Sequence, residues 1–150
     1  MEVFVLDLDA LRPRMDEALA LLSPARREKA LRLRRELPRL QSAGAGLLLR
    51  AFFGPDDPMI ARGGKPSFPG KGFFSLTHSG TISAIALGSE EVGLDAEGIA
   101  LPRQAVLPRV LSAEELHRPD SRDGEGFAFL WTRKEAALKC IGTGDRKSVV

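Results

Sequence analysis

The pattern of apolar and polar residues in the first third of the chain predicts one strand and two helices. Residues 3–8 alternate between apolar and acidic side chains, which is the two-residue period of a strand. Residues 24–37 begin with Pro24 after a serine, a favourable helix start, and supply the apolar positions of a helix. Residues 42–53 are mostly apolar and should form a buried helix that ends at Gly54.

The rest of the chain continues to mix helices and strands. In chain order the pattern predicts a glycine- and proline-rich loop at 63–72, strands at 73–77 and 81–87 around a turn at 78–80, a strand at 92–97, some helix within 101–111, a polar loop at 118–126 and a helix at 127–141. The strand at 92–97 and the helix at 127–141 carry most of the charged motifs considered below.

Composition is typical of a globular protein with one compact domain. The 150 residues are 43% hydrophobic and 28% charged, and no apolar run approaches the roughly 20 residues of a membrane span. The first residues lack the basic stretch of a signal peptide. A single cysteine, Cys140, cannot form an internal disulfide and is interpreted as a packing residue. We therefore expect a cytoplasmic protein that does not bind membranes.

Basic residues gather in one short stretch although the net charge is only +2. They are Arg26, Arg27, Lys29, Arg32, Arg34, Arg35 and Arg39. One interpretation is a solvated helix face whose charge is relieved by Glu28 and Glu36. Another is a nucleic-acid surface, but no aromatic residues interleave with the arginines and no nucleic-acid motif is visible. Nucleic acid is therefore the less favoured partner.

Two charged motifs suggest a metal and phosphate site. Asp95 and Glu97 occupy alternate positions of the expected strand at 92–97, so both carboxylates should face one side. In the later helix, Glu135 and Lys139 are one turn apart and share a face. Mg²⁺ is usually held by one or two carboxylates, phosphate oxygens and water. Each motif alone has an ordinary alternative, a chance Asp-x-Glu or a solvated helix face.

Seven short segments occur in an order that matches a known family. They are Leu-Ser-Pro-Ala-Arg-Arg-Glu-Lys at 22–29, Gly-Lys-Pro at 64–66, Phe-Ser-Leu-Thr-His-Ser-Gly at 74–80, Gly-Leu-Asp-Ala-Glu at 93–97, Leu-Ser-Ala-Glu-Glu-Leu at 111–116, Trp-Thr-Arg-Lys-Glu at 131–135 and Gly-Thr-Gly at 142–144. Together they resemble the 4′-phosphopantetheinyl transferases of the larger, pseudo-dimeric type, from residue 1 to residue 144.

The resemblance implies a fold and a reaction. The fold would be α/β (α+β), with two similar halves and the site between them. Residues 1–88 would form the N-terminal half, on the side of the coenzyme A 3′-phosphate and adenine. Residues 89–144 would begin the C-terminal half, with the Mg²⁺ and catalytic motifs. The reaction moves the phosphopantetheine arm of coenzyme A onto a serine of an apo acyl or peptidyl carrier protein and releases adenosine 3′,5′-bisphosphate.

The resemblance also assigns roles at the metal and catalytic motifs. Asp95, Glu97 and Glu135 would hold Mg²⁺ on the coenzyme A pyrophosphate. Glu135 would take the serine proton, directly or through a metal-bound water. Lys139 would neutralise charge on the leaving phosphate. Lys134 would support the pyrophosphate or pair with a carboxylate.

Further residues would bind coenzyme A itself. Arg26 and Lys29 match positions that contact the 3′-phosphate, the Lys65-Pro66 pair would lie against the adenine and its neighbouring phosphate, and Thr77 and His78 would donate to the phosphates. One departure from the family pattern is Gln41, which stands where an arginine is common. Arg39 is a cation close enough in sequence to compensate.

The last residues, 145–150, do not continue the family pattern and are interpreted as a non-native tail that leaves the second half incomplete. Three hypotheses follow: an active transferase, a coenzyme A-binding remnant without turnover, and an unrelated basic binding module. Catalysis separates the first two, and salt-dependent nucleic-acid binding would mark the third.

Overall fold

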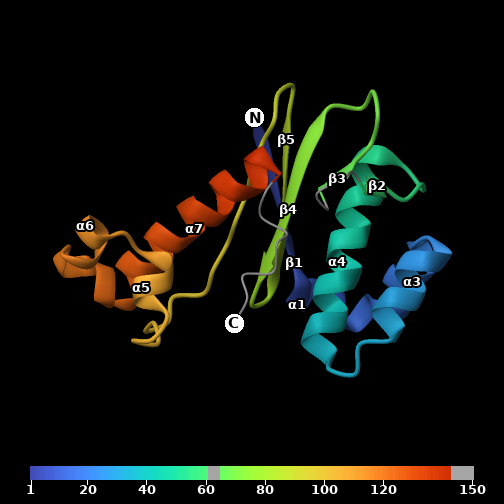
Figure 1. Cartoon of the computed structure of the whole chain (residues 1–150). Coiled ribbons are helices and arrows are strands. Elements are labelled where there is room, and N and C mark those ends of the chain that lie inside the picture. The colour runs from blue at the N-terminus through green and yellow to red at the C-terminus, as the bar shows by residue number, and fades with distance from the viewer. Residues whose placement is uncertain (61–64, 143–150) are drawn as a thin grey trace.

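A computed structural model describes residues 1–60 and 65–142 as a three-stranded sheet with helical structure on both faces (Figure 1). The elements in chain order are β1 (Glu2–Asp7), α1 (Leu8–Leu11), η1 (Arg12–Arg14), α2 (Met15–Leu21), α3 (Pro24–Leu31), α4 (Glu36–Phe53), β2 (Met59–Ile60), β3 (Pro66–Ser67), β4 (Phe73–Ser79), β5 (Ile82–Gly88), α5 (Leu107–Val110), α6 (Ala113–Leu116), η2 (Pro119–Arg122) and α7 (Gly124–Ile141). This mixture confirms the α/β class.

The main sheet has the order β1-β5-β4, with both neighbours antiparallel to β5. The strand predicted at 3–8 is confirmed as β1. The β4–β5 turn lies later than predicted, because His78 and Ser79 still pair with Ser83 and Ile82 within the sheet. The connection is instead Gly80 and the residue after it, and Gly80 has a φ of 51°, which glycine adopts without strain.

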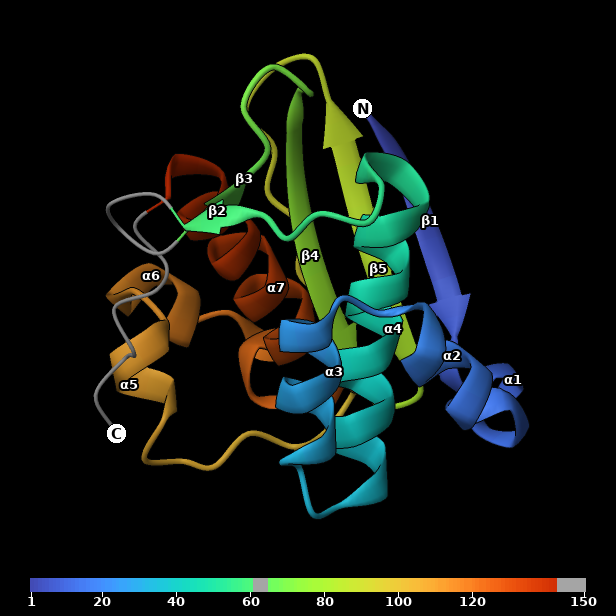
Figure 2. The same cartoon turned by 90° about the vertical axis from the view of Figure 1, so that its right-hand side faces the viewer.

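Helix α4 packs along one face of the sheet and builds the largest part of the core (Figure 2). The buried members of this cluster are Leu48, Leu49, Phe53, Phe68, Phe74 and Ile85. The aromatic rings of Phe53 and Phe68 stack at 4.5 Å between centroids. A second cluster joins α2, α3 and α4, and a third joins α5 to α7.

The single helix predicted at 24–37 is wrong, since the chain breaks between α3 and α4. Ser23 caps α3 as expected, because its hydroxyl accepts a hydrogen bond from the Arg26 amide at 3.2 Å. Pro38 explains where α4 begins, since a proline fits the first turn of a helix but interrupts the interior. The side chain of Arg39 donates to the Leu33 carbonyl at 2.8 and 3.1 Å, which satisfies an acceptor at the break. The predicted helix end at Phe53 is confirmed.

Helix α7 begins three residues before the predicted start at 127, within the segment predicted to be a polar loop. The Asp123 side chain caps it by accepting from the Gly126 amide at 2.6 Å. No helix within the described ranges is long and apolar enough to cross a membrane. β5 ends at Gly88, where the division into 1–88 and 89–144 was predicted, but the division itself stays a prediction. The tail at 145–150 lies outside the described residues.

Candidate functional site

The segment with Asp95 and Glu97 lies against β4 without being a strand, which corrects the prediction for 92–97. The amide of Leu94 donates to Ser75 Oγ at 3.0 Å, and the amide of Ala96 donates to Thr77 Oγ1 at 3.1 Å. Side-chain hydroxyls of β4 therefore take the place of the backbone carbonyls of a strand ladder. We call residues 92–97 the acidic segment.

Helix α7 holds the acidic segment from its other side. Gly93 lies so close to the helix that a Cβ there would come within 1.8 Å of the Ala136 carbonyl oxygen. Lys139 Nζ also donates to the carbonyl of Leu94 at 3.2 Å. The acidic segment is thus fixed between β4 and α7, and the missing side chain of Gly93 permits this close approach.

Three residues of α7 separated by single turns, Trp131, Glu135 and Lys139, share the face toward the acidic segment. Lys139 Nζ forms an ion pair with Asp95 Oδ1 at 2.5 Å. Trp131 Nε1 donates to Glu97 Oε1 at 3.2 Å. Glu135 lies between these two contacts along the helix, so three candidate metal ligands gather in one region of the molecule.

Asp95 is held more tightly than an ordinary surface carboxylate. Its side chain is only 6% exposed, and its Oδ1 also accepts from Thr77 Oγ1 at 3.3 Å. Its Oδ2 is buried and has no hydrogen-bond partner among the described residues. A buried carboxylate oxygen without a donor is costly, and a cation would satisfy it.

The environment of Glu135 also favours a cation. Burial raises the pKa of the Glu135 carboxyl, and the carboxylates of Asp95 and Glu97 raise this pKa further. Lys139 opposes these effects and lowers the pKa. A divalent cation would reduce the repulsion between the three carboxylates.

The carboxylate oxygens of Asp95, Glu97 and Glu135 are ligands that suit Mg²⁺. Their side chains are not, however, already arranged around a single ion position. Within residues 1–60 and 65–142, no three His, Cys, Asp or Glu side chains are gathered closely enough to hold an ion as they stand. Asp95 Oδ1 already accepts a hydrogen bond from Lys139, and Glu97 Oε1 already accepts one from Trp131. The assignment of Asp95, Glu97 and Glu135 as ligands therefore stays a prediction.

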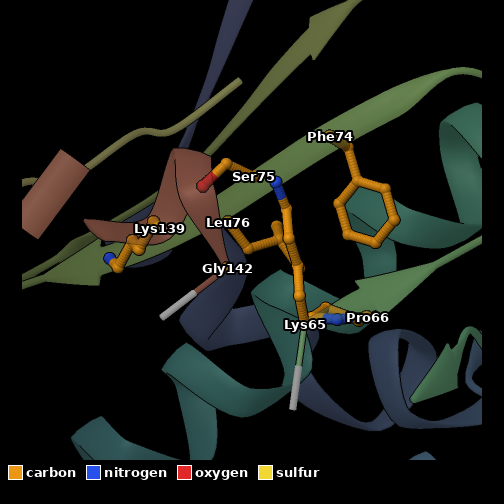
Figure 3. Close-up of a pocket in the computed structure, with 7 residues that line it drawn as sticks. All are labelled: Lys65, Pro66, Phe74, Ser75, Leu76, Lys139 and Gly142. Carbon is orange, nitrogen blue, oxygen red and sulfur yellow. The ribbon is translucent and has the colours of Figure 1, made fainter. Parts of the chain in front are cut away.

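A cavity of about 200 Å³ lies beside Lys139 (Figure 3). It is lined by Lys65, Pro66, Phe74, Ser75, Leu76, Lys139 and Gly142. Lys65 forms an ion pair with Glu91 and donates to the Cys140 carbonyl, at the end of α7, at 3.0 Å. The structure thus brings two predicted coenzyme A residues, Lys65 and Pro66, to the same cavity as Lys139.

Thr77 and His78, both predicted to bind the coenzyme A phosphates, face opposite sides of the sheet. Successive residues of β4 face opposite sides of the sheet, so Thr77 is buried toward the acidic segment while His78 is exposed on the α4 side. The Thr77 hydroxyl is engaged by Asp95 and Ala96. It therefore helps to position the acidic segment, and its contact with a phosphate stays a prediction.

The predicted 3′-phosphate residues lie apart from that cavity. Arg26 pairs with Asp57 at 3.4 Å and lines a separate small cavity between α3 and α4, and Lys29 is exposed on α3. Gln41 lies near the β4–β5 turn, where its side-chain amide donates to the Gly80 carbonyl at 2.9 Å. His78 is two residues from this contact. The assignment of Arg26 and Lys29 to coenzyme A stays a prediction.

Lys134 pairs with a carboxylate of α6, and its assignment to coenzyme A stays a prediction. Its ammonium group forms an ion pair with Glu115 and donates to the Val110 carbonyl at 2.7 Å. It ties α7 to α5 and α6 and is not among the residues that line the cavity beside Lys139.

Three residues with a clear part in the site were missed by sequence reasoning: Ser75, Glu91 and Trp131. The spacing of Trp131, four residues before Glu135, could have indicated that it shares the face of the catalytic motif. Ser75 contacts Leu94 and Glu91 contacts Lys65, and a local sequence pattern cannot predict contacts between residues so far apart in the chain.

Comparison with known proteins identifies the segment that contains this arrangement. Residues 91–149 match the model of the 4′-phosphopantetheinyl transferase superfamily. The match includes both the acidic segment and α7, so the two parts of the site that contact each other are also the parts shared with the family.

Two curated proteins of that superfamily are similar to this chain. The 4′-phosphopantetheinyl transferase psf-1 of Bacillus pumilus is 37% identical over 83 residues, which cover 53% of this chain and 34% of that protein. A Synechocystis sp. protein named "Putative 4'-phosphopantetheinyl transferase slr0495" is 38% identical over 80 residues, which cover 48% of this chain and 32% of that protein. The chain thus spans about a third of the length of these relatives.

Proposed function

We propose that this protein is a 4′-phosphopantetheinyl transferase, which moves the phosphopantetheine arm of coenzyme A to a serine of an apo acyl or peptidyl carrier protein. The observation that carries the proposal is the position of Lys139. It contacts Asp95 of the acidic segment and also lines the cavity that contains Lys65 and Pro66. One side chain thereby connects the carboxylates with a cationic cavity, within a segment shared with known transferases.

The cavity has the chemistry that part of coenzyme A requires. Its two lysines offer ammonium groups to phosphate oxygens, and its walls of Pro66, Phe74 and Leu76 offer apolar contact. A neighbouring cavity of about 430 Å³ shares Lys65, Pro66 and Phe74. Since coenzyme A combines phosphates with an adenine and a long pantetheine arm, we assign the first cavity to the pyrophosphate and the second to an adjoining group.

Asp95, Glu97 and Glu135 are the residues that we propose hold Mg²⁺, which when bound would withdraw charge from the pyrophosphate. Lys139, now paired with Asp95, would turn toward the leaving phosphate and neutralise its charge. Trp131 keeps Glu97 on the correct side of α7. Ser75 and Thr77 fix the backbone between the two acidic residues.

Glu135 is the proposed general base. Its raised pKa makes its carboxylate more able to accept a proton than an ordinary surface glutamate. The carrier serine loses its hydroxyl proton to Glu135 while its oxygen attacks the β-phosphorus. The bond from that phosphorus to the adenosine bisphosphate oxygen breaks, and adenosine 3′,5′-bisphosphate leaves.

Transfer is tested by incubating the protein with coenzyme A, Mg²⁺ and an apo carrier protein and measuring the mass of the carrier. We expect the mass of one phosphopantetheine arm to be added. Glu97→Ala and Glu135→Ala should each abolish the Mg²⁺-dependent gain and leave the far-ultraviolet circular dichroism spectrum unchanged. Glu125→Ala is the matched control, because Glu125 is exposed in the first turn of the same helix.

Near-normal transfer by either site variant at low Mg²⁺ would disprove the three-carboxylate assignment. If the wild type binds coenzyme A and leaves the carrier unmodified, the protein is a coenzyme A-binding protein without turnover. The pairing of Asp95 with Lys139 is the observation that favours this second candidate, because it keeps one ligand engaged.

A further inference from the structure

Positive charge is concentrated around α3, away from the acidic segment and α7. Residues 24–39 contain seven Arg and Lys residues against two Glu, whereas the whole chain carries a net charge of +2. The rest of the chain is therefore net acidic. Figure 1 places α3 beyond α4, on the side away from α7. This stretch forms a separate electrostatic feature of the molecule.

Some of these cations are used within the fold. Arg26 pairs with Asp57, Arg32 pairs with Glu28, and Arg39 donates to the Leu33 carbonyl. Glu36 pairs with Arg12. Apart from Arg39, four cations of the stretch form no ion pair among the described residues: Arg27, Lys29, Arg34 and Arg35. They lie exposed and can meet acidic groups of another molecule.

Exposed leucines accompany the unpaired arginines. Leu31 is 50% exposed and lies one helical turn after Arg27, on the same face of α3. Leu21, at the end of α2, is 51% exposed. Between α2 and α3 runs a surface groove of about 660 Å³, lined by Ala20, Leu22, Pro24, Arg27, Leu31 and Arg32. Glu28, the acidic residue that also lines it, is already paired with Arg32.

We propose that this groove, with Arg34 and Arg35 beside it, docks an acidic amphipathic helix of a partner protein. Carboxylates of the partner would meet Arg27, Arg34 and Arg35, and its apolar residues would cover Leu21 and Leu31. A helix presents both kinds of side chain in adjacent stripes, which matches the one-turn spacing of Arg27 and Leu31. A nucleic acid fits less well, because a phosphate backbone would not cover the two leucines.

This inference does not depend on the proposed transfer reaction, and its test requires none. The probe is a synthetic helical peptide of about 20 residues with glutamates on one face and leucines on the other. A second peptide carries Gln in place of each Glu. Binding to the whole protein is measured by fluorescence anisotropy over a range of salt concentrations. A short DNA duplex is titrated in parallel.

We expect the Glu peptide to bind, the Gln peptide to bind at least about tenfold more weakly, and added salt to weaken binding of the Glu peptide. The double variant Arg27→Gln/Arg34→Gln should lose about tenfold in affinity for the Glu peptide. Leu31→Ala should lose several-fold, about what removing a few buried methyl groups costs. The control is Arg14→Gln, since Arg14 is an exposed cation on η1 that is already paired with Glu17, and it should bind like the wild type.

The proposal is overturned if the Glu peptide does not bind, or if the Gln peptide binds equally well. It is also overturned if the double variant or Leu31→Ala keeps wild-type affinity while Arg14→Gln behaves as expected. Tighter binding of the DNA duplex, lost in the same double variant, would instead make this a nucleic-acid surface. Circular dichroism of each variant confirms that a loss of affinity is not a loss of fold.

Discussion

At the scale of single residues, Asp95 is the most buried of the three proposed metal ligands and is held in place by its contacts. It is nearly buried, one oxygen is paired with Lys139, and the other has no partner among the described residues. Removing one member of a buried ion pair is costly, because the remaining charge is left uncompensated. We expect Lys139 to release Asp95 when a cation or a phosphate enters the site. Asp95 and Lys139 are therefore best studied by conservative substitutions.

Gln41→Arg tests the assignment of the 3′-phosphate. The Gln41 amide contacts the Gly80 carbonyl, at the turn next to His78, so an arginine there would add positive charge beside that histidine. We expect tighter binding of coenzyme A and nearly unchanged binding of dephospho-coenzyme A, measured by calorimetry. The gain should be about tenfold if one charge-assisted contact forms. Equal gains for both ligands would show that position 41 does not face the 3′-phosphate.

Ser83→Ala tests the packing of α4 against the sheet. Ser83 is completely buried, and its hydroxyl has no hydrogen-bond partner among the described residues. A buried hydroxyl without a partner is destabilising, so its removal should raise the free energy of unfolding by about 1 kcal/mol. Thermal unfolding measures the change. A lower midpoint would show that the hydroxyl is hydrogen-bonded after all. Ser75→Ala provides the contrast, since Ser75 accepts from the Leu94 amide and its loss should destabilise.

At the scale of elements, the site depends on the acidic segment lying between β4 and α7. Its amides meet the hydroxyls of Ser75 and Thr77, and its other side meets the α7 backbone at Gly93. The two contacts with β4 follow the two-residue spacing of a strand, although no strand forms. The sequence therefore indicates the two-residue spacing of 92–97 correctly, but the strand that this spacing predicts does not form.

Gly93→Ala should separate the acidic segment from α7. The added methyl group would overlap the Ala136 carbonyl oxygen, which belongs to the helix backbone and cannot rotate away. We expect a loss of stability of about 1–3 kcal/mol, together with loss of Mg²⁺-dependent transfer. Gly98→Ala serves as the control, because a Cβ at Gly98 would come no closer than 4.0 Å to the Ser79 hydroxyl oxygen. Wild-type stability and transfer in Gly93→Ala would refute the clamped arrangement.

The link between α6 and α7 should weaken in acid. The Lys134 ammonium and the Ser112 amide hold the pKa of Glu115 below its usual value near 4.5. Since this pKa is lower in the folded protein, the ion pair contributes stability above the unfolded pKa and loses it as pH falls through the folded pKa. The free energy of unfolding should therefore fall less between pH 6 and pH 3.5 (approximate values) in Glu115→Gln than in the wild type. Glu114→Gln should follow the wild type, and equal curves for all three proteins would contradict the account.

The sequence predicted the helices and strands that depend on interactions between residues close together in the chain. The strand at β1, the end of α4 at Gly54 and most of α7 follow from alternation, a helix stop and helical spacing. The break before α4 depends on Pro38, which a longer helix could not have accommodated, and that signal was present in the sequence but not used. The contacts of Ser75 and Glu91 join residues far apart in the chain, so only the folded structure shows them.

At the scale of the whole molecule, the candidate site lies between two parts that have separate hydrophobic clusters. The core on α4 and the sheet is distinct from the small cluster of Leu107, Leu111 and Leu130 on α5 and α7. Polar contacts between the acidic segment, β4 and Lys139 join the two parts. Elements joined mainly by exposed or polar contacts open more readily than a hydrophobic core. We therefore expect ligand binding to order α7 against the sheet.

We propose that Mg²⁺ and coenzyme A share one site formed by the acidic segment and α7. The most direct test is a calorimetric titration of coenzyme A into the wild type and into Glu135→Gln, each with Mg²⁺ and with a chelator. Because coupled sites affect each other equally, Mg²⁺ should tighten coenzyme A binding in the wild type, and coenzyme A should tighten Mg²⁺ binding by the same factor. Glu135→Gln should lose most of this coupling while still binding coenzyme A through the lysines. Coenzyme A affinity that is the same with Mg²⁺ and with chelator in the wild type would contradict the account.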